Sequence, residues 1–355
     1  MVLNEASDIM LGNQEVQKVY LGQTLVWERK KGYDNTKITL IKLDSNYQET
    51  NNFQYFDTIA ETKNALDANK NHFYKLVIGK KLPISNIPQN SFSHCTNLVD
   101  IEIFDNIKEI KEYAFSDTGL VSIKISEHIM NIGTGAFSNC HYLNSAVFSD
   151  GIKSIPNSLF INCENLTQVL LPEHLMNISD SAFSGCNKLS EINIPDQIIN
   201  IGNMAFYNCT ALQEIIISEN LKNIGNYAFW GCESLTSIRL PNQLENIGQY
   251  VFFGCKNLSH IVLSENLKNI NDSAFSGCVS LTEINIPEQV IRIGQRAFDE
   301  CTSLQKITIP ASINIIENNA FNRCTNLEKI TIHKVENSIS GSPWGATNAE
   351  IIWTE

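Results

Sequence analysis

The sequence predicts a repeat solenoid of the α/β type, made of about eleven coils of 23 residues that share one parallel β-sheet. Two observations lead to this prediction. Nine of the ten cysteines recur every 23 residues, from Cys140 to Cys324, and a phenylalanine stands three residues before each of the ten. A period of about 20–50 residues indicates stacked units that bury their apolar residues against each other.

The earlier part of the array keeps the same pattern with one exception. Cys95 precedes Cys140 by 45 residues, which is 23 plus 22, and Thr118 stands where the missing cysteine would be. Phe115 precedes Thr118 at the usual distance, so this short unit still counts as a coil. The eleven phenylalanines are Phe92, Phe115, Phe137, Phe160, Phe183, Phe206, Phe229, Phe252, Phe275, Phe298 and Phe321.

Each unit follows the pattern L-x-x-I-x-I-P-x-x-[ILV]-x-x-I-G-x-x-A-F-x-x-C, as in residues 189–209. The L-x-x-I-x-I segment has apolar residues at a spacing of two, which is typical of a short strand with one buried face. The I-G-x-x-A-F segment is too short for a long helix, and we expect a turn followed by one helical or 3₁₀ turn. One strand per coil then builds a single parallel sheet.

This pattern resembles the BspA-like class of leucine-rich repeat proteins, and the resemblance covers about residues 74–333. It implies a leucine-rich repeat horseshoe that serves as a binding or adhesion surface. Catalysis is not expected from this resemblance.

The cysteine series has two interpretations, redox or metal chemistry on one side and small buried side chains that close each coil on the other. No C-x-x-C pair and no histidine cluster accompanies the cysteines, so a zinc site is not predicted. Burial is therefore the preferred interpretation, and we predict neither a metal site nor a cofactor.

The charge and the apolar content of the chain argue against nucleic acid and membranes as partners. The net charge is −12, which argues against a nucleic-acid binder because such proteins need a basic patch. No apolar run approaches the roughly 20 residues of a membrane-spanning helix, so membrane insertion is not expected. The first twelve residues lack the features of a secretory signal peptide.

Residues 17–28 are predicted to form a β-hairpin around a two-residue turn at Gly22 and Gln23. Both faces of this hairpin carry apolar residues, so it must pack on a larger sheet or on another chain. The expected pairs are Leu21–Thr24, Tyr20–Leu25, Val19–Val26 and Lys18–Trp27. The candidate anchoring residues are Tyr20, Leu25 and Trp27 on one face and Val19 and Val26 on the other.

A second resemblance concerns the two ends of the chain. Residues 8–28, with the motif V-Y-L-G-x-x-x-V-W, resemble a short N-terminal segment of tailed-phage virion proteins. Residues 341–353, GSPWGATNAEIIW, resemble the closing element of leucine-rich repeat proteins encoded in phages and prophages. This resemblance implies attachment to other virion proteins through the N-terminal segment.

We divide the chain into an anchoring hairpin (1–31), a linker with a helical cap (32–73), the solenoid (74–333) and a C-terminal cap (334–355). Residues 38–43 are a candidate strand, and the first coil begins with a strand at residues 74–78. Thr58 and Glu61 form a capping box that starts a helix. We expect Ile59 and Leu66 of this helix to cover the open edge of the first coil. At the other end, Trp344, Ile351, Ile352 and Trp353 are expected to cap the last coil.

Variation between repeats marks two candidate binding surfaces. Val147 and Leu170 occupy neighbouring outward positions of the predicted sheet and form an apolar contact face. The position after the repeat phenylalanine is usually serine, but it is aromatic in three successive coils. The aromatic residues of this region are Tyr207, Trp230, Phe253, Tyr227 and Tyr250. Two interpretations remain open for them, a local packing ladder or a stacking platform for a sugar or protein partner.

No catalytic motif is recognisable, so no catalytic residues are assigned and an enzyme is not predicted. The leading hypothesis is a virion-associated tail, fibre or decoration component that recognises a host-surface protein or glycan. The alternative is a bacterial leucine-rich repeat surface adhesin or interaction protein without phage association. The predicted location is the virion, with the bacterial cell surface or the cytoplasm as alternatives. The sequence leaves open whether the chain forms a homo-oligomer.

Overall fold

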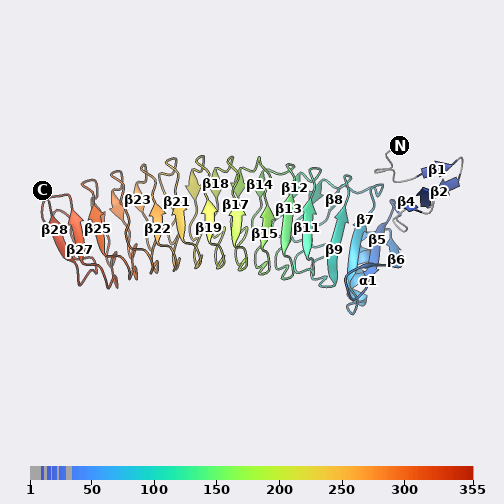
Figure 1. The fold of residues 1–355 in the computed structure, drawn as a ribbon, viewed down its shortest axis with the longest axis horizontal. Coiled ribbons are helices and arrows are strands. Elements are labelled where there is room, and N and C mark those ends of the chain that lie inside the picture. Colours follow the sequence, from blue (N-terminus) through green and yellow to red (C-terminus); the bar gives the residue numbers. More distant parts are fainter. Residues whose placement is uncertain (1–8, 12–13, 17, 22–23, 29–33, 355) are drawn as a thin grey trace.

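The computed structural model describes residues 9–11, 14–16, 18–21, 24–28 and 34–354, and it describes side chains from residue 34 onward. Residues 74–353 form one elongated solenoid in which coils follow each other along a single axis (Figure 1). A first row of strands, one from most coils, runs along one side and pairs in parallel. Its members are β7 (Tyr74–Ile78), β9 (Leu98–Ile103), β11 (Ser122–Ile125), β13 (Ser145–Phe148), β15 (Gln168–Leu170), β17 (Glu191–Asn193), β19 (Glu214–Ile216), β21 (Ser237–Arg239), β22 (His260–Val262), β25 (Lys306–Ile309), β27 (Lys329–Ile332) and β28 (Glu350–Trp353).

A second row of strands, which the sequence analysis did not predict, lies on another side of the coils. Each member has two residues, and neighbouring members also pair in parallel. They are β8 (Asn86–Ile87), β10 (Glu109–Ile110), β12 (Asn131–Ile132), β14 (Ser154–Ile155), β16 (Asn177–Ile178), β18 (Asn200–Ile201), β20 (Asn223–Ile224), β23 (Asn269–Ile270), β24 (Arg292–Ile293) and β26 (Ile315–Ile316). The expectation of one strand per coil is therefore wrong.

The expected helical or 3₁₀ turn is also absent from the coils that the structure describes. The segment after the second strand is instead a turn that contains a left-handed residue, such as Met204 with φ +54°. A left-handed residue interrupts a right-handed helix. The I-G motif requires glycine for a steric reason. A Cβ on Gly225 would lie 2.5 Å from the backbone nitrogen of Asn203 in the preceding coil.

The interior holds one column of stacked phenylalanine rings that runs through all eleven coils. Ring centroids of neighbours lie 5.4 Å apart for Phe183 and Phe206 and 6.1 Å apart for Phe137 and Phe160. These side chains are fully buried together with the repeat Leu, Ile, Ala and Cys residues. Since no coil can bury these residues alone, burial between neighbours stabilises the solenoid. We call this column the phenylalanine ladder.

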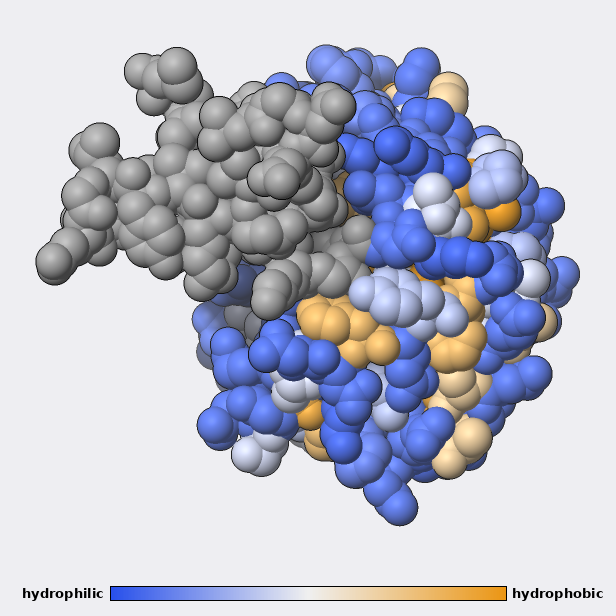
Figure 2. Space-filling model, turned by 90° about the vertical axis from the view of Figure 1, so that its right-hand side faces the viewer, coloured by the Kyte–Doolittle hydropathy of each residue, from blue (hydrophilic) through white to orange (hydrophobic). Residues whose placement is uncertain are grey.

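The N-terminal end is closed by a sheet extension and a helix. The strands β5 (Ile38–Leu43) and β6 (Glu49–Phe56) continue the first row in the order β6-β5-β7-β9, with β5 antiparallel to β7. The predicted strands at residues 38–43 and 74–78 and the capping box of α1 (Ile59–Ala68) are confirmed. The described part of this end is mostly hydrophilic on its surface (Figure 2).

One expectation about this cap needs correction. The edge of β7 is covered by β5, because Ile38–Lys42 pair with Tyr74–Ile78, and not by the helix. The helix covers the interior end of the first coil instead, with Leu66 fully buried and Ile59 packed against the core. Lys63 ties it to the turn of that coil by donating from Nζ to the carbonyl oxygen of Ser93 at 3.0 Å. The cap therefore closes the sheet edge and the apolar interior with different elements.

The C-terminal cap confirms the expectation for its four apolar residues. Strand β28 pairs in parallel with β27 and carries Ile351, Ile352 and Trp353. Trp344 is buried, and its indole nitrogen donates to the carbonyl oxygen of Ser340 at 2.8 Å. The last coil is thus covered by a segment whose strand extends the parallel sheet. Trp344, and not a phenylalanine, fills the interior there.

The chain before residue 34 contains the strands β1 (Ile9–Leu11), β2 (Gln14–Val16), β3 (Lys18–Leu21) and β4 (Thr24–Glu28). Strands β3 and β4 form the predicted antiparallel pair, and Leu21–Thr24 and Tyr20–Leu25 pair as expected. The register then shifts by one residue, so Val19 faces Trp27 and Lys18 faces Glu28. The expected pairs Val19–Val26 and Lys18–Trp27 are wrong, because a bulge between Val19 and Tyr20 leaves Val26 of β4 without a partner. The turn at Gly22 and Gln23 lies outside the described residues.

Candidate functional site

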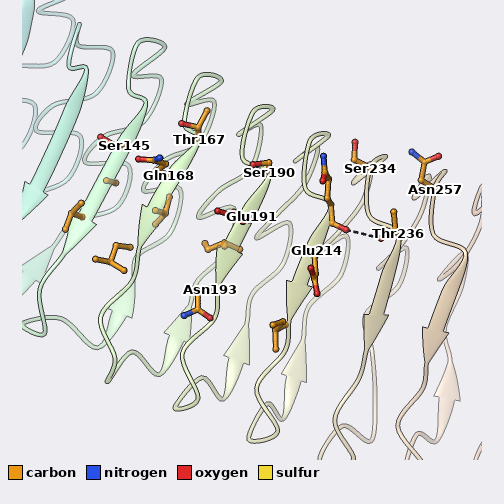
Figure 3. A pocket seen from close by; sticks show the side chains of 17 residues that line it. Ser145, Thr167, Gln168, Ser190, Glu191, Asn193, Glu214, Ser234, Thr236 and Asn257 are labelled. Carbon is orange, nitrogen blue, oxygen red and sulfur yellow. Dashed lines mark hydrogen bonds between the residues drawn. The ribbon is translucent and has the colours of Figure 1, made fainter.

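The outward face of the central first-row strands forms a groove of about 920 Å³. We call it the sheet-face groove. Two rows of side chains line it, and Figure 3 shows Gln168, Glu191 and Asn193 projecting from neighbouring strands. The outer row is Val147, Leu170, Asn193 and Ile216, and the second row is Ser145, Gln168, Glu191 and Glu214. Alternation along each strand produces both rows, because intervening residues such as Ile192 and Ile215 point into the core.

The outer row exposes three aliphatic side chains to solvent. Val147 is 36% exposed, Leu170 59% and Ile216 68%. Val147 lies beside Leu170, and Asn193 lies beside Ile216, in adjacent paired strands. The predicted outward orientation of Val147 and Leu170 is confirmed. Their exposure leaves apolar side chains on the outward face of these strands.

Charged residues surround this apolar face. The carboxylates of Glu191 and Glu214 lie in the second row of the groove. Lys124 stands one strand before Val147, and Arg239 stands one strand after Ile216. Arg239 lies 3.9 Å from Glu219 in an exposed ion pair, which contributes little to stability. Charged groups around an apolar face can contribute specificity by complementarity.

The five aromatic residues predicted on the turn side form one continuous stacked cluster, which we call the outer aromatic cluster. Trp230 is at its centre, with its ring centroid 5.9 Å from Tyr207 and 3.9 Å from Phe253. Tyr227 and Tyr250 stack on each other at 4.9 Å and tilt against Trp230 at 5.5 and 5.7 Å. All five rings are half-buried. Each keeps part of its face toward solvent while the other part packs on a neighbour.

Tyr227 and Tyr250 occupy the left-handed position that recurs in the turns of the other coils. Tyr227 and Tyr250 have φ values of +59° and +56°, in the left-handed region where other coils have Ser181 and Ser273. A large side chain at such a position is uncommon. It directs two rings to the surface of the turn, where they complete the cluster around Trp230. The sequence signal for this cluster was its occurrence in three successive coils only.

The cysteines are buried and unpaired in the structure. Most donate a weak hydrogen bond to the carbonyl oxygen of the phenylalanine one coil earlier, as Cys232 does to Phe206 at 3.2 Å. Thr118 replaces this group in the short coil, and its hydroxyl donates to the carbonyl oxygen of Phe115 at 2.9 Å. Burial raises the pKa of the Cys95 thiol to about 11 and that of Cys324 to about 12. Buried neutral thiols are structural groups.

Among the residues with described placement, no group of three or more His, Cys, Asp or Glu side chains is arranged to hold a metal ion. The same part of the chain contains no helix long and apolar enough to cross a membrane.

Comparison with known protein families identifies the family to which the chain belongs. The family model described as the BspA type leucine rich repeat region matches residues 68–190, 176–301 and 268–349. The chain belongs to this family. The resemblance inferred from the repeat pattern is thereby confirmed, and so is the leucine-rich repeat solenoid fold.

Solved structures add related leucine-rich repeat proteins. A leucine-rich repeat protein from Bacteroides ovatus shares 27% identity with a TM-score of 0.61, covering 79% of this chain and 84% of that one. A leucine rich cell surface protein from Faecalibacterium prausnitzii shares 26% identity with a TM-score of 0.48, covering 72% and 78%. The pneumococcal vaccine antigen PcpA shares 18% identity with a TM-score of 0.47, covering 79% of each chain. A search of curated proteins finds no match.

The remaining candidate residues of this BspA-type protein belong to the N-terminal hairpin. Tyr20 and Val19 lie in β3, and Leu25, Val26 and Trp27 lie in β4. Their side chains lie outside the described part of the structure, so their anchoring role stays a prediction. The contact roles of the groove residues and of the outer aromatic cluster likewise stay predictions, now with a defined geometry.

Proposed function

We propose that this BspA-type protein is a non-enzymatic recognition protein that binds a host-surface protein or glycan across the sheet-face groove. The observation that carries the proposal is the row of exposed Val147, Leu170 and Ile216 within a groove of about 920 Å³. The volume is within the range of about 300–1,000 Å³ for binding sites. The apolar row lies among a mostly polar lining that includes Gln168, Asn193 and Glu214.

The energetics of this row support a contact function. Burial of one aliphatic side chain of this size stabilises a complex by about 1.5–3 kcal/mol. Leu170 and Ile216 are more than half exposed in the free protein, so most of that contribution is available to a partner. Glu191 and Glu214 beside them favour a partner that offers hydrogen-bond donors or positive charge.

The outer aromatic cluster is the second proposed contact surface. Its rings offer large flat faces with few rotatable bonds, as in many carbohydrate and protein interfaces. It lies on the turn side and shares no residue with the sheet-face groove. The two surfaces are therefore separable by mutation.

The place of display is a separate part of the proposal. We infer that residues 1–31 attach the protein to other virion proteins, because the V-Y-L-G-x-x-x-V-W motif resembles a segment of tailed-phage structural proteins. Display on a bacterial cell surface without phage association is the alternative. Mass spectrometry of purified virions, after prophage induction in the producing strain, separates the two. Presence in particles supports attachment to the virion, and recovery only from cell envelopes supports the alternative.

The groove is tested with Ile216→Asp and Leu170→Asp in the full chain. The probe is labelled protein on a panel of intact bacterial and epithelial cells and on a glycan array. We expect each substitution to weaken binding by at least about tenfold, as loss of a central contact does. Ile315→Asp is the matched control, since Ile315 is an exposed isoleucine in strand β26, outside the sheet-face groove. Equal binding by all three variants contradicts the assignment of the groove.

A further inference from the structure

The second coil is one residue shorter than the other coils, and the missing residue comes from one particular loop. Two residues separate the repeat cysteine from the repeat leucine in the third coil, namely His141 and Tyr142. In the second coil Gly119 alone separates Thr118 from Leu120. A Cβ on Gly119 would lie 2.2 Å from the carbonyl oxygen of Thr96 in the first coil. The chain therefore passes this point without any side chain.

A recess lies beside this shortened loop, between the first and third coils. It has a volume of about 610 Å³, and we call it the short-coil notch. Thr96 and Asn97 of the first coil line one side, and His141 and Tyr142 of the third coil line the other. The recess is within the size range of about 300–1,000 Å³ for small-ligand sites.

Three aromatic side chains stand around the notch. Tyr142 is 66% exposed on the third coil, and Tyr47 and Phe73 of the N-terminal cap are 52% and 42% exposed. The rings of Tyr47 and Phe73 contact each other with centroids 5.0 Å apart. The notch is thus bordered by aromatic faces from two separate parts of the chain.

The turn that presents Tyr47 is held in place by Asp44. The Asp44 carboxylate accepts hydrogen bonds from the backbone nitrogens of Asn46 at 2.8 Å and Gln48 at 2.9 Å. Tyr47 itself has a left-handed φ of +61°. A bulky residue in this conformation costs free energy and persists only where its surroundings enforce it. The turn therefore holds Tyr47 in an ordered position beside the recess.

Polar side chains line the notch together with the aromatic ones. The Asp117 carboxylate accepts from Nδ1 of His94 at 2.8 Å, and His141 lies 3.9 Å from Glu164. Lys70 lines the cap side. The buried Asn97 side chain is fixed, because its amide nitrogen donates to the carbonyl oxygens of Leu66 at 3.0 Å and Asn69 at 3.3 Å. Asp117, His141 and Lys70 thus place polar groups in the lining of the notch.

We propose that the short-coil notch binds a neutral saccharide. A pyranose ring presents an apolar face of C–H groups, which suits Tyr142, Tyr47 and Phe73, and a rim of hydroxyls, which suits Asp117, His141 and Lys70. The chain carries a net charge of −12, so acidic sugars are disfavoured by long-range repulsion. This site goes beyond the sheet-face groove and shares no lining residue with it.

Saturation-transfer NMR on the full chain tests the proposal. The probes are the methyl pyranosides of glucose, galactose, mannose and N-acetylglucosamine and their β-linked disaccharides. We expect at least one probe to bind. Tyr142→Ala and Tyr47→Ala should each weaken that binding by at least about tenfold. Tyr113→Ala is the matched control, because Tyr113 is an exposed tyrosine of the second coil outside the notch.

A second variant tests the notch itself. Insertion of one asparagine after Gly119 restores the usual loop length and should also abolish binding of the probe. The groove variant Ile216→Asp should bind it unchanged, which separates this site from the proposed function. Absence of binding to every probe overturns the proposal, as does equal binding by the tyrosine variants and the Tyr113 control. Selection of apolar peptides at the notch, without saccharide binding, overturns it as well.

Discussion

The solenoid carries two stacks of aromatic rings, which differ in burial and in the number of coils they occupy. The phenylalanine ladder has one fully buried ring in every one of the eleven coils. The outer aromatic cluster has half-buried rings confined to three successive coils, centred on Trp230. A residue that recurs in every coil closes the core, whereas the outer rings depart from the repeat and are not needed in the other coils to close it.

The residues that pack around the two stacks also differ. The phenylalanine ladder packs beside the buried cysteines and the repeat leucines, so any truncation there opens a cavity between two coils. The outer cluster packs mainly on itself, with Trp230 only 3.9 Å from Phe253 in centroid distance. Loss of one outer ring exposes its neighbours to water but leaves the core closed. The two stacks should therefore respond differently to the same kind of substitution.

The largest expected effect concerns the ladder. Phe229→Ala should lower the free energy of unfolding by about 3–5 kcal/mol, because it removes a fully buried ring stacked between Phe206 and Phe252. Equilibrium denaturation in urea measures this loss. A loss below about 1 kcal/mol would show that the ladder does not carry the stability of the central coils.

The thiols beside the ladder should be protected from modification in the folded protein. Burial raises the pKa of Cys95 to about 11 and that of Cys324 to about 12, so these two thiols stay neutral at pH 8. The reactive thiolate fraction falls about tenfold for each unit by which pH lies below the pKa. Iodoacetamide labelling followed by mass spectrometry should show slow modification of all ten cysteines without denaturant. Rapid labelling of several thiols, or disulfide-linked peptides, would contradict a closed interior.

The smallest expected effect on stability comes from deletion of residues 1–31. The described hydrophobic core starts at Ile38, and the first-row sheet starts with β6 and β5, so the solenoid should keep its stability within about 0.5 kcal/mol. Under the virion proposal, the same deletion should abolish incorporation into particles. Comparing truncated and full-length protein in purified particles measures this second outcome, and wild-type incorporation of the truncated chain would remove the anchoring role.

Prediction from sequence worked where the physical signal was local or repeated. The Thr58–Glu61 capping box and the candidate strand at residues 38–43 follow from short-range sequence signals, and both are confirmed. The second-row strands have two residues each, which is too short for any alternation to be visible. The hairpin bulge between Val19 and Tyr20 has no glycine or other marker in that stretch of sequence.

The candidate surfaces were only partly predictable for a related reason. Departures from the repeat marked Trp230 and its neighbours, and strand alternation marked Val147 and Leu170. The short second coil was visible as a gap of 22 residues, but the notch beside it needs Tyr47 and Phe73 from the cap. Such long-range proximity depends on how the cap docks, which no local pattern encodes.

The most direct test of the account compares two neighbouring residues, Phe229 and Trp230, which belong to the two stacks. Melting temperature and binding to host cells or arrayed glycans are measured on Trp230→Ala and on Phe229→Ala. The account predicts that Trp230→Ala weakens binding by about 2 kcal/mol or more with little change in melting temperature. Phe229→Ala should lower the melting temperature strongly. A clear loss of stability with unchanged binding in Trp230→Ala would contradict the account and make the outer aromatic cluster a packing element.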